Sequence, residues 1–206
     1  MLYEARPGTP GESRLEALGL DIPTIHEVLH YGDAEQATYT VLDAPGAGEY
    51  ARWSRHVRRL SERLIPRGWE RINPDNQPTL VHPDRRHCVV VASGTGATGR
   101  HYAAPTTKNP KGRTIQAAVQ SNAALALLAL HDVAPELASL RETWMLLTFV
   151  NIDGQIQSEV SLPNAMEGEQ ISSWRDRILI PTLDPSVGPD HANEEPPDYD
   201  FDIVRK

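Results

Sequence analysis

The sequence predicts a single α+β domain over about residues 22–183, in which an antiparallel or mixed sheet packs against two main helices. Three observations support this class. Candidate strands occur in groups, first a three-strand meander and later a hairpin, and do not alternate singly with helices. Two long stretches between these groups repeat apolar residues at helical spacing. The length of 206 residues suits one domain with a core and a tail.

The first predicted segments are short. Residues 1–21 are rich in proline and glycine, and we expect them to form a flexible, loosely held N-terminal arm. Pro23 opens a short candidate helix over Thr24–Tyr31, which Gly32 ends. The segment Thr38–Leu42 has the composition of a strand.

The stretch Gly48–Ile65 is the clearest amphipathic helix of the sequence. Its apolar face consists of Tyr50, Trp53, Val57, Leu60 and Leu64. Its basic face consists of Arg52, Arg55, His56, Arg59 and Arg63. The basic face is either an ordinary solvated surface or a stripe that faces an anion.

Three short strands follow and form the predicted meander: Trp69–Ile72, Thr79–His82 and Cys88–Ser93. The third is apolar on both faces, which is typical of a central strand. After it, Gly94–Arg113 is a long loop interrupted by prolines, and such loops are often functional. A buried, apolar helix is then predicted from Thr114 to about His131.

The last predicted elements are a hairpin and an ambiguous segment. Thr143–Val150 is a second central strand, and Gln155–Leu162 returns half exposed, because apolar residues alternate with polar ones such as Glu159. Ile171–Ile180 fits either a helix or a strand. Prolines and acidic residues then predominate, so residues 184–206 are predicted to form a flexible acidic tail.

Composition limits the classes of function. The net charge of −8 disfavours non-specific binding to nucleic acid or anionic membranes, so any anion site must be local. The single cysteine, Cys88, excludes an internal disulfide and a multi-cysteine metal site, and we expect it to be buried. No signal peptide and no membrane-spanning apolar run are visible. We therefore expect a soluble, cytoplasmic protein without a membrane partner.

The strongest functional signal is the segment from Arg85 to His131, which contains no aspartate or glutamate in a chain that has 28 of them. Its central loop supplies cationic side chains, glycines that allow close backbone approach, and free N–H groups at the start of the next helix. We therefore predict a site for phosphate, a nucleotide or a nucleic-acid backbone. The expected anion-binding residues are Gly94, Gly96, Gly99, Arg100, Lys108, Lys111, Gly112, Arg113 and Thr114.

The loop fits neither of two common phosphate-binding patterns. Gly94–Gly99 matches G-x-G-x-x-G, but the following residues lack the helix that a dinucleotide site requires. The segment Lys108–Thr114 lacks the spacing of a Walker A loop. Tyr102 is the only aromatic residue of the loop, so phosphate contact is expected and a base-stacking platform is not.

A second candidate site is the segment His26-Glu-Val-Leu-His30, which matches the H-E-x-x-H pattern of zinc hydrolases. On a helix the two histidines would bind zinc, and Glu27 would act as the catalytic base for the bound water. The sequence marks no third zinc ligand. The histidines near the meander and the loop are expected to face solvent: His82, His87 and His101.

The leading hypothesis is a non-enzymatic binding or accessory protein, without a cofactor, that contacts an anionic partner through residues 94–114. The first alternative is a zinc-dependent hydrolase or peptidase that uses residues 26–30. The second is a protein–protein interaction module that acts through the acidic tail. The tail is also a candidate ligand for the protein's own basic segment.

Overall fold

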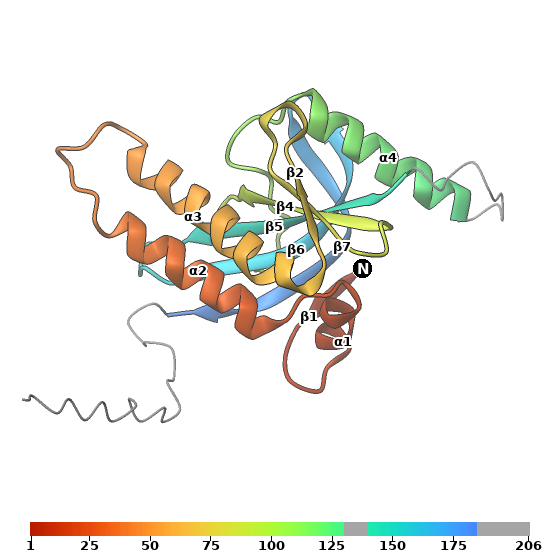
Figure 1. Ribbon diagram of the computed structural model, residues 1–206, viewed down its shortest axis with the longest axis horizontal. Helices are drawn as coiled ribbons and strands as arrows, with labels where there is room; N and C mark the ends of the chain where they lie inside the picture. Colours follow the sequence, from red (N-terminus) through yellow and green to blue (C-terminus); the bar gives the residue numbers. More distant parts are fainter. Residues whose placement is uncertain (130–139, 185–206) are drawn as a thin grey trace, which may run out of the picture.

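The computed structural model describes residues 1–129 and 140–184, which form a seven-stranded mixed sheet with four α-helices (Figure 1). The strands are β1 (Leu2–Glu4), β2 (Glu70–Ile72), β3 (Thr79–Val81), β4 (His87–Ser93), β5 (Glu142–Val150), β6 (Ile156–Glu167) and β7 (Gln170–Leu183). The helices are α1 (Pro10–Ala17), α2 (Ile22–Gln36), α3 (Ala47–Leu64) and α4 (Arg113–Ala129). The predicted α+β class is therefore confirmed.

The order of strands across the sheet is β1-β7-β6-β5-β4-β3-β2. The pairs β1–β7 and β4–β5 are parallel, and the other neighbours are antiparallel. The predicted meander corresponds to β2, β3 and β4, and the predicted hairpin corresponds to β5 and β6. The sheet is thus of the mixed kind, with a parallel pair at its centre whose connection contains the long loop and α4.

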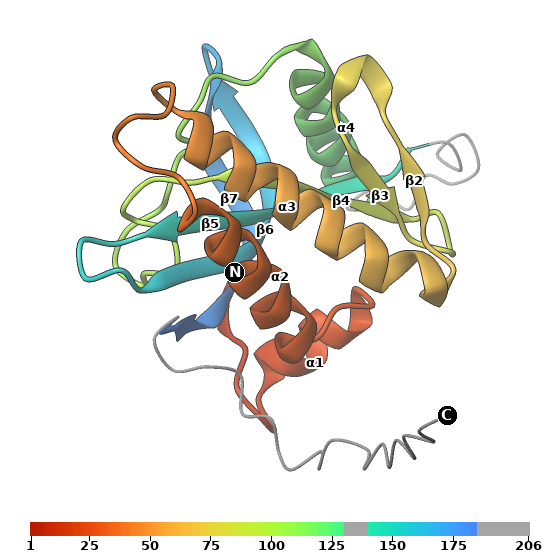
Figure 2. The same ribbon diagram turned by 60° about the vertical axis from the view of Figure 1, so that its left-hand side comes forward.

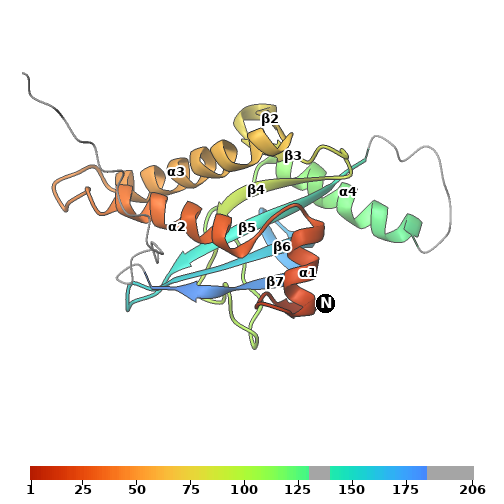
Figure 3. The same cartoon turned by 60° about the horizontal axis from the view of Figure 1, so that its bottom comes forward.

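One face of the sheet is covered by α2 and α3, which lie side by side above the strands in Figure 3. Most of the predicted apolar stripe of α3 packs there against inward-facing side chains of the central strands, whereas Tyr50 is exposed. Members of this larger core cluster include Leu60, Leu64, Trp144, Leu146 and Val160. Burial of each such side chain contributes roughly 1.5–3 kcal/mol to stability, so the amphipathic pattern alone fixes which side of α3 faces the sheet.

The opposite face carries α4 and a smaller apolar cluster. This cluster consists of Val90, Ala92, Ile115, Val119, Met145, Leu147 and Ile171. The buried side-chain amide of Asn122 joins α4 to the sheet, because its Nδ2 donates to the carbonyl oxygens of Thr143 and Pro163, both at 3.0 Å. Burial of such an amide is tolerated when its hydrogen bonds are satisfied.

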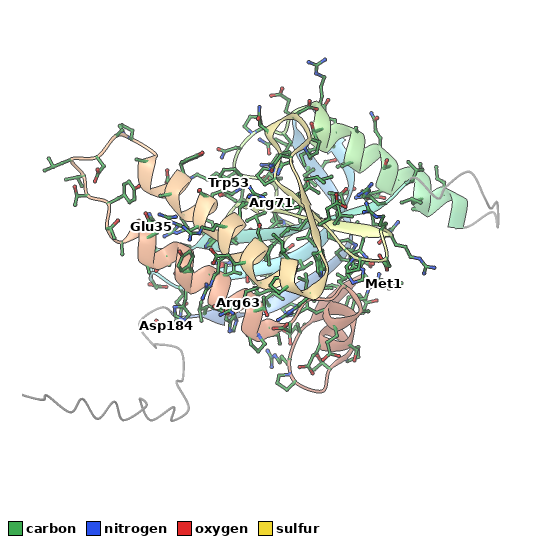
Figure 4. All side chains as sticks on the ribbon, in the orientation of Figure 1. Met1, Glu35, Trp53, Arg63, Arg71 and Asp184 are labelled. Atoms are coloured by element: carbon green, nitrogen blue, oxygen red, sulfur yellow. The ribbon has the colours of Figure 1, made fainter. Side chains whose placement is uncertain are left out.

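The basic face of α3 is balanced by acids of α2. The ion pairs between the two helices are Arg52–Asp33, Arg55–Glu35, Arg59–Glu27 and Arg63–Glu27. Figure 4 shows Glu35 and Arg63 on these neighbouring helices. His56, which was predicted on the same face, is buried. The arginine charges of this face are therefore paired with α2, although Arg63 remains exposed to solvent.

The predicted end of α2 at Gly32 is wrong, since the helix continues to Gln36. Gly32 serves instead as a point of close approach to α3. A Cβ atom at this position would lie 2.2 Å from Cδ2 of His56 and 2.9 Å from the carbonyl oxygen of Arg52. The absence of a side chain thus lets the two helices pack closely around the His56 ring.

Residues 1–21 differ from the predicted arm, because they form part of the domain. β1 pairs in parallel with β7, and α1 lies next to the first turns of α2 (Figure 2). The core contains Leu15, Leu18 and Leu20 from this segment. The burial of these leucines depends in part on β7, which is distant in sequence, so local composition gave no signal for it.

Two further segments can be compared with their predictions, and two other predictions fall outside the described residues. Thr38–Leu42 forms no strand, and Val41 and Leu42 are fully exposed in the connection between α2 and α3. The ambiguous segment Ile171–Ile180 lies within strand β7. The predicted helix end at His131 and the acidic tail after residue 184 lie outside the described residues. No helix of the described ranges combines the length and the apolar character needed to cross a bilayer.

We predict that Gly32→Ala destabilises the protein by about 1–3 kcal/mol, because the added methyl group overpacks the α2–α3 contact. The sign of the change in the free energy of unfolding distinguishes the two cases, since Gly→Ala in an unobstructed helix interior stabilises by about 1 kcal/mol. Urea unfolding, followed by circular dichroism, measures the difference.

Gly96→Ala is the matched control, because a Cβ atom there would meet Phe149 at 3.6 Å, an ordinary contact distance. Its unfolding midpoint should stay close to that of the parent protein. A stabilised Gly32→Ala variant would show that α2 and α3 are not in close contact at this point.

Candidate anion-binding cleft

A cleft of about 840 Å³ lies between the N-terminal half of α3, the carboxyl ends of β4 and β5, and the loop of residues 94–112. We call this the β4–β5 cleft. Because β4 and β5 are parallel and in register up to Ser93 and Thr148, they end side by side at its floor. The space outside the carboxyl ends of parallel strands is where open α/β sheets bind ligands.

The first part of the loop folds back on itself and returns to the end of β4. An isolated bridge pairs Gly94 with Thr107, and the Lys108 N–H donates to the carbonyl oxygen of Ser93 at 2.8 Å. The Lys111 N–H donates to the carbonyl oxygen of Glu169 at 2.8 Å. These backbone bonds bring Lys108 and Lys111, which follow the return, to the wall of the cleft.

The two lysines of the cleft differ in their surroundings. The Lys108 ammonium pairs with the Glu49 carboxylate of α3 at 3.1 Å. Lys111 is half-buried, and burial lowers the pKa of its ammonium group. No carboxylate within residues 1–129 and 140–184 forms an ion pair with Lys111. Lys111 is therefore a partly desolvated cation without a counter-charge in the described part of the chain.

The α3 wall of the cleft is aromatic and electrically balanced. The Trp53 Nε1–H donates to the carbonyl oxygen of Val91 at 3.0 Å, which holds the indole against β4, and Figure 4 shows Trp53 on α3. The Tyr50 ring lies 5.6 Å from the Trp53 ring, centroid to centroid. His56 is neutral at pH 7, because burial and the nearby Arg52 lower its pKa to about 4. The helical spacing predicted Tyr50 and Trp53 on the apolar face of this helix and gave no indication that they line a cleft.

Of the nine predicted anion-binding residues, four line the β4–β5 cleft: Gly94, Gly96, Lys108 and Lys111. The other five do not line it. Gly112 is the residue before α4, and its carbonyl oxygen accepts from the N–H groups of Ile115 and Gln116, both at 3.1 Å. Thr114 donates its hydroxyl to Asp75 Oδ2 at 2.8 Å. The start of α4, including Arg113, is thus outside the cleft, near the β2–β3 turn.

Gly99 and Arg100 lie at a buried ion pair between Glu159 of β6 and Arg177 of β7. The Gly99 N–H donates to Glu159 Oε2 at 2.8 Å, and Arg177 donates to the carbonyl oxygens of Arg100 and Ala103, at 3.1 and 2.8 Å. Arg177 Nε also donates to Glu159 Oε1 at 2.9 Å. The predicted exposure of Glu159 is wrong, because the loop covers this face of β6 and leaves Glu159 fully buried.

The H-E-x-x-H segment forms part of α2, but His26 and Glu27 already have partners. His26 Nε2 lies 3.0 Å from the carbonyl oxygen of Pro181, in hydrogen-bond contact. The Glu27 carboxylate pairs with Arg59 and Arg63, which lower its pKa and hold it away from the role of a base. In the described ranges no third histidine, cysteine or carboxylate completes a three-ligand group with the two histidines.

Comparison with known proteins found no matching family model, no similar curated protein and no similar solved structure. The functional assignment therefore depends on the geometry and electrostatics of the chain itself.

Cys88 offers no reactive thiolate, since it is buried and burial raises its pKa.

We predict that Arg177→Met destabilises the protein by about 3–5 kcal/mol, because it leaves the Glu159 carboxylate buried without its counter-charge. Arg58→Met is the control, since the Arg58–Glu62 pair is exposed and such pairs contribute little. Urea unfolding gives the stabilities. Amide hydrogen exchange should show faster exchange at Gly99 in Arg177→Met, and equal stabilities of the two variants would contradict the assigned role of the pair.

Proposed function

We propose that the protein is a binding or accessory protein whose β4–β5 cleft holds a small anionic ligand, with a phosphate or similar group beside Lys111. The observation that carries this proposal is the half-buried Lys111 ammonium, which has no counter-charge among the described residues. A desolvated cation is unfavourable until an anion pairs with it. A bound anion would therefore gain more at this lysine than at an exposed one.

The form of the cleft favours a small ligand over a polyanion. Its volume lies within the range of roughly 300–1,000 Å³ that small-molecule sites occupy. A nucleic-acid backbone requires several free cations in a row. Here Lys108 is paired with Glu49, and Arg52, the α3 arginine that lines the cleft, is paired with Asp33 of α2. The charges available to a ligand are thus concentrated at one lysine.

The remaining walls suit a ligand that joins an anionic group to a ring. Tyr50, Trp53 and Phe149 contribute aromatic surface to the cleft, and Gly94 and Gly96 offer backbone without side chains. Aromatic faces stack with nucleobases irrespective of their identity. A mononucleotide combines these features with phosphate, so nucleotides are the first class to test. The protein's own acidic tail is a competing source of carboxylates, and it lies outside the described residues.

We predict that Lys111→Met weakens binding of inorganic phosphate or a mononucleotide about tenfold to hundredfold, which corresponds to the loss of one charge-assisted hydrogen bond. Calorimetric titration of the purified full chain measures the affinity. The same variant should have a higher melting temperature than the parent protein without ligand, because a desolvated charge is replaced by an apolar side chain of similar length.

Arg100→Met is the matched control, since Arg100 is a cation of the same loop that lies outside the cleft. It should bind like the parent protein. Equal loss in both variants would indicate a general charge effect, and unchanged affinity in Lys111→Met would refute the proposed site. Binding that appears only after removal of residues 185–206 would identify the tail as the native occupant.

A further inference from the structure

The turn that joins β3 to β4 brings together two histidines and one aspartate. His82, Asp84 and His87 each direct one potential metal-ligating atom to the same place, and these atoms all lie within 4.8 Å of one another. Both histidines were predicted to face solvent. The prediction is wrong for His87, which is buried, and His82 is only half-exposed.

The turn itself fixes the three residues. The His82 N–H donates to the carbonyl oxygen of His87 at 3.1 Å, which closes the turn. Arg85 adopts a φ of 61° in the left-handed region, and its N–H donates to the carbonyl oxygen of His82 at 2.9 Å. The Arg86 N–H donates to Asp84 Oδ1 at 2.8 Å. Because the backbone holds the carboxylate, its position does not depend on a ligand.

The two measured distances between potential donors lie on either side of the spacing expected around a small divalent metal ion. His82 Nδ1 lies 2.9 Å from Asp84 Oδ1, and His87 Nδ1 lies 3.8 Å from the same oxygen. Around tetrahedral zinc, with metal–ligand bonds of about 2.0–2.2 Å, donor atoms lie roughly 3.3–3.5 Å apart. One ion could therefore contact all three side chains after small rotations.

A hydrogen bond on the far side of the His87 ring orients it as in metal sites. His87 Nε2 lies 3.1 Å from the carbonyl oxygen of Leu18, a contact that requires the proton on Nε2 and leaves Nδ1 with a lone pair. His82 Nδ1 lies 3.3 Å from the Asp84 backbone nitrogen and 2.9 Å from Asp84 Oδ1, so a bound metal ion would replace these local contacts. The lone pair of His87 Nδ1 and the Asp84 carboxylate are therefore directed to the same place, where a cation could contact both.

Neighbouring elements support both rings from the inside. The two imidazoles stack at a centroid distance of 4.3 Å, and the buried Trp69 indole contacts them edge-on, at 4.9 Å from His82 and 5.7 Å from His87. Gly19, after α1, leaves space for the His82 ring, because a Cβ atom there would lie 3.0 Å from it. The outer side is open, since Asp84 is exposed.

We propose that His82, Asp84 and His87 form a binding site for a divalent transition-metal ion such as zinc, with the remaining coordination position open to water. Two imidazole nitrogens and one carboxylate oxygen suit zinc and similar ions better than magnesium or calcium, which prefer oxygen ligands alone. The site is separate from the β4–β5 cleft and from the H-E-x-x-H segment of α2, and it does not depend on the function proposed for the cleft.

The test is calorimetric titration of zinc into the chelator-treated full chain at pH 7. One ion should bind per chain, and Asp84→Asn and His82→Gln should each weaken binding by about tenfold or more. Asp84→Asn keeps an oxygen that can accept from the Arg86 N–H, so the turn should persist, and its circular dichroism spectrum checks the fold. His26→Gln and His101→Gln are the controls, and both should bind zinc like the parent protein.

A second readout uses cobalt, whose unpaired electrons quench nearby tryptophan fluorescence. Quenching should saturate at one ion per chain and should decrease in Trp69→Phe, because Trp69 contacts both histidines. The proposal is overturned if the parent protein binds no zinc. It is also overturned if zinc binding survives in Asp84→Asn and His82→Gln but is lost in His26→Gln, which would place the metal in α2.

Discussion

The buried ion pair between Glu159 and Arg177 is the contact that fixes the path of the long loop over the sheet. A fully buried carboxylate is strongly unfavourable unless its charge is balanced and its oxygens accept hydrogen bonds. Arg177 supplies the charge, and the Ser161 hydroxyl and the Gly99 N–H supply two further bonds. Arg177 in turn donates to the carbonyl oxygens of Arg100 and Ala103.

The ion pair between Glu159 and Arg177 also affects the β4–β5 cleft, because it positions the loop that lines the cleft. With residues 99–103 held against β6 and β7, the rest of the loop must return along the end of β4, where Gly94 pairs with Thr107. That return places Lys111 in a half-buried position opposite α3. A flexible loop would let the lysine reach water or an acid, whereas a fixed loop keeps it at the cleft. The structural ion pair and the candidate ligand site are in this way parts of one arrangement.

The sequence predicted much of the fold because local patterns determine it. The period of α3 and the apolar runs of β4 and β5 identify buried faces without knowledge of the partner. Where contact with another segment of the chain determines whether a residue is buried, the prediction was wrong. Leu15 in α1 is buried only because β7 and α2 lie beside it, and Glu159 is buried only because the loop covers its face of β6.

In the candidate site, too, local sequence predicted some features, while contacts between distant segments determine the others. The absence of acids between Arg85 and His131 drew attention to the loop that lines the β4–β5 cleft, but it could not show which of its cations lie there unpaired. Ranking requires the pairing partners, and these come from distant segments: Glu49 neutralises Lys108, while Lys111 has no partner in the described ranges. The histidines near the meander were dismissed for a related reason. The short spacing of His82 and His87 indicates a turn, but the contacts that Leu18 and Trp69 make with the His87 ring come from other segments.

The protonation of Lys111 tests the central claim most directly, because the chain has only three lysines and their side-chain NMR signals can be assigned by substitution. The measurement is a pH titration of ¹³C-labelled lysine, followed at Cε, with and without inorganic phosphate. We expect the pKa of Lys111 to lie below the ordinary lysine value of about 10.4 in the free protein and to rise when phosphate binds. An ordinary pKa that phosphate leaves unchanged would contradict the account of an unpaired, desolvated cation that awaits an anion.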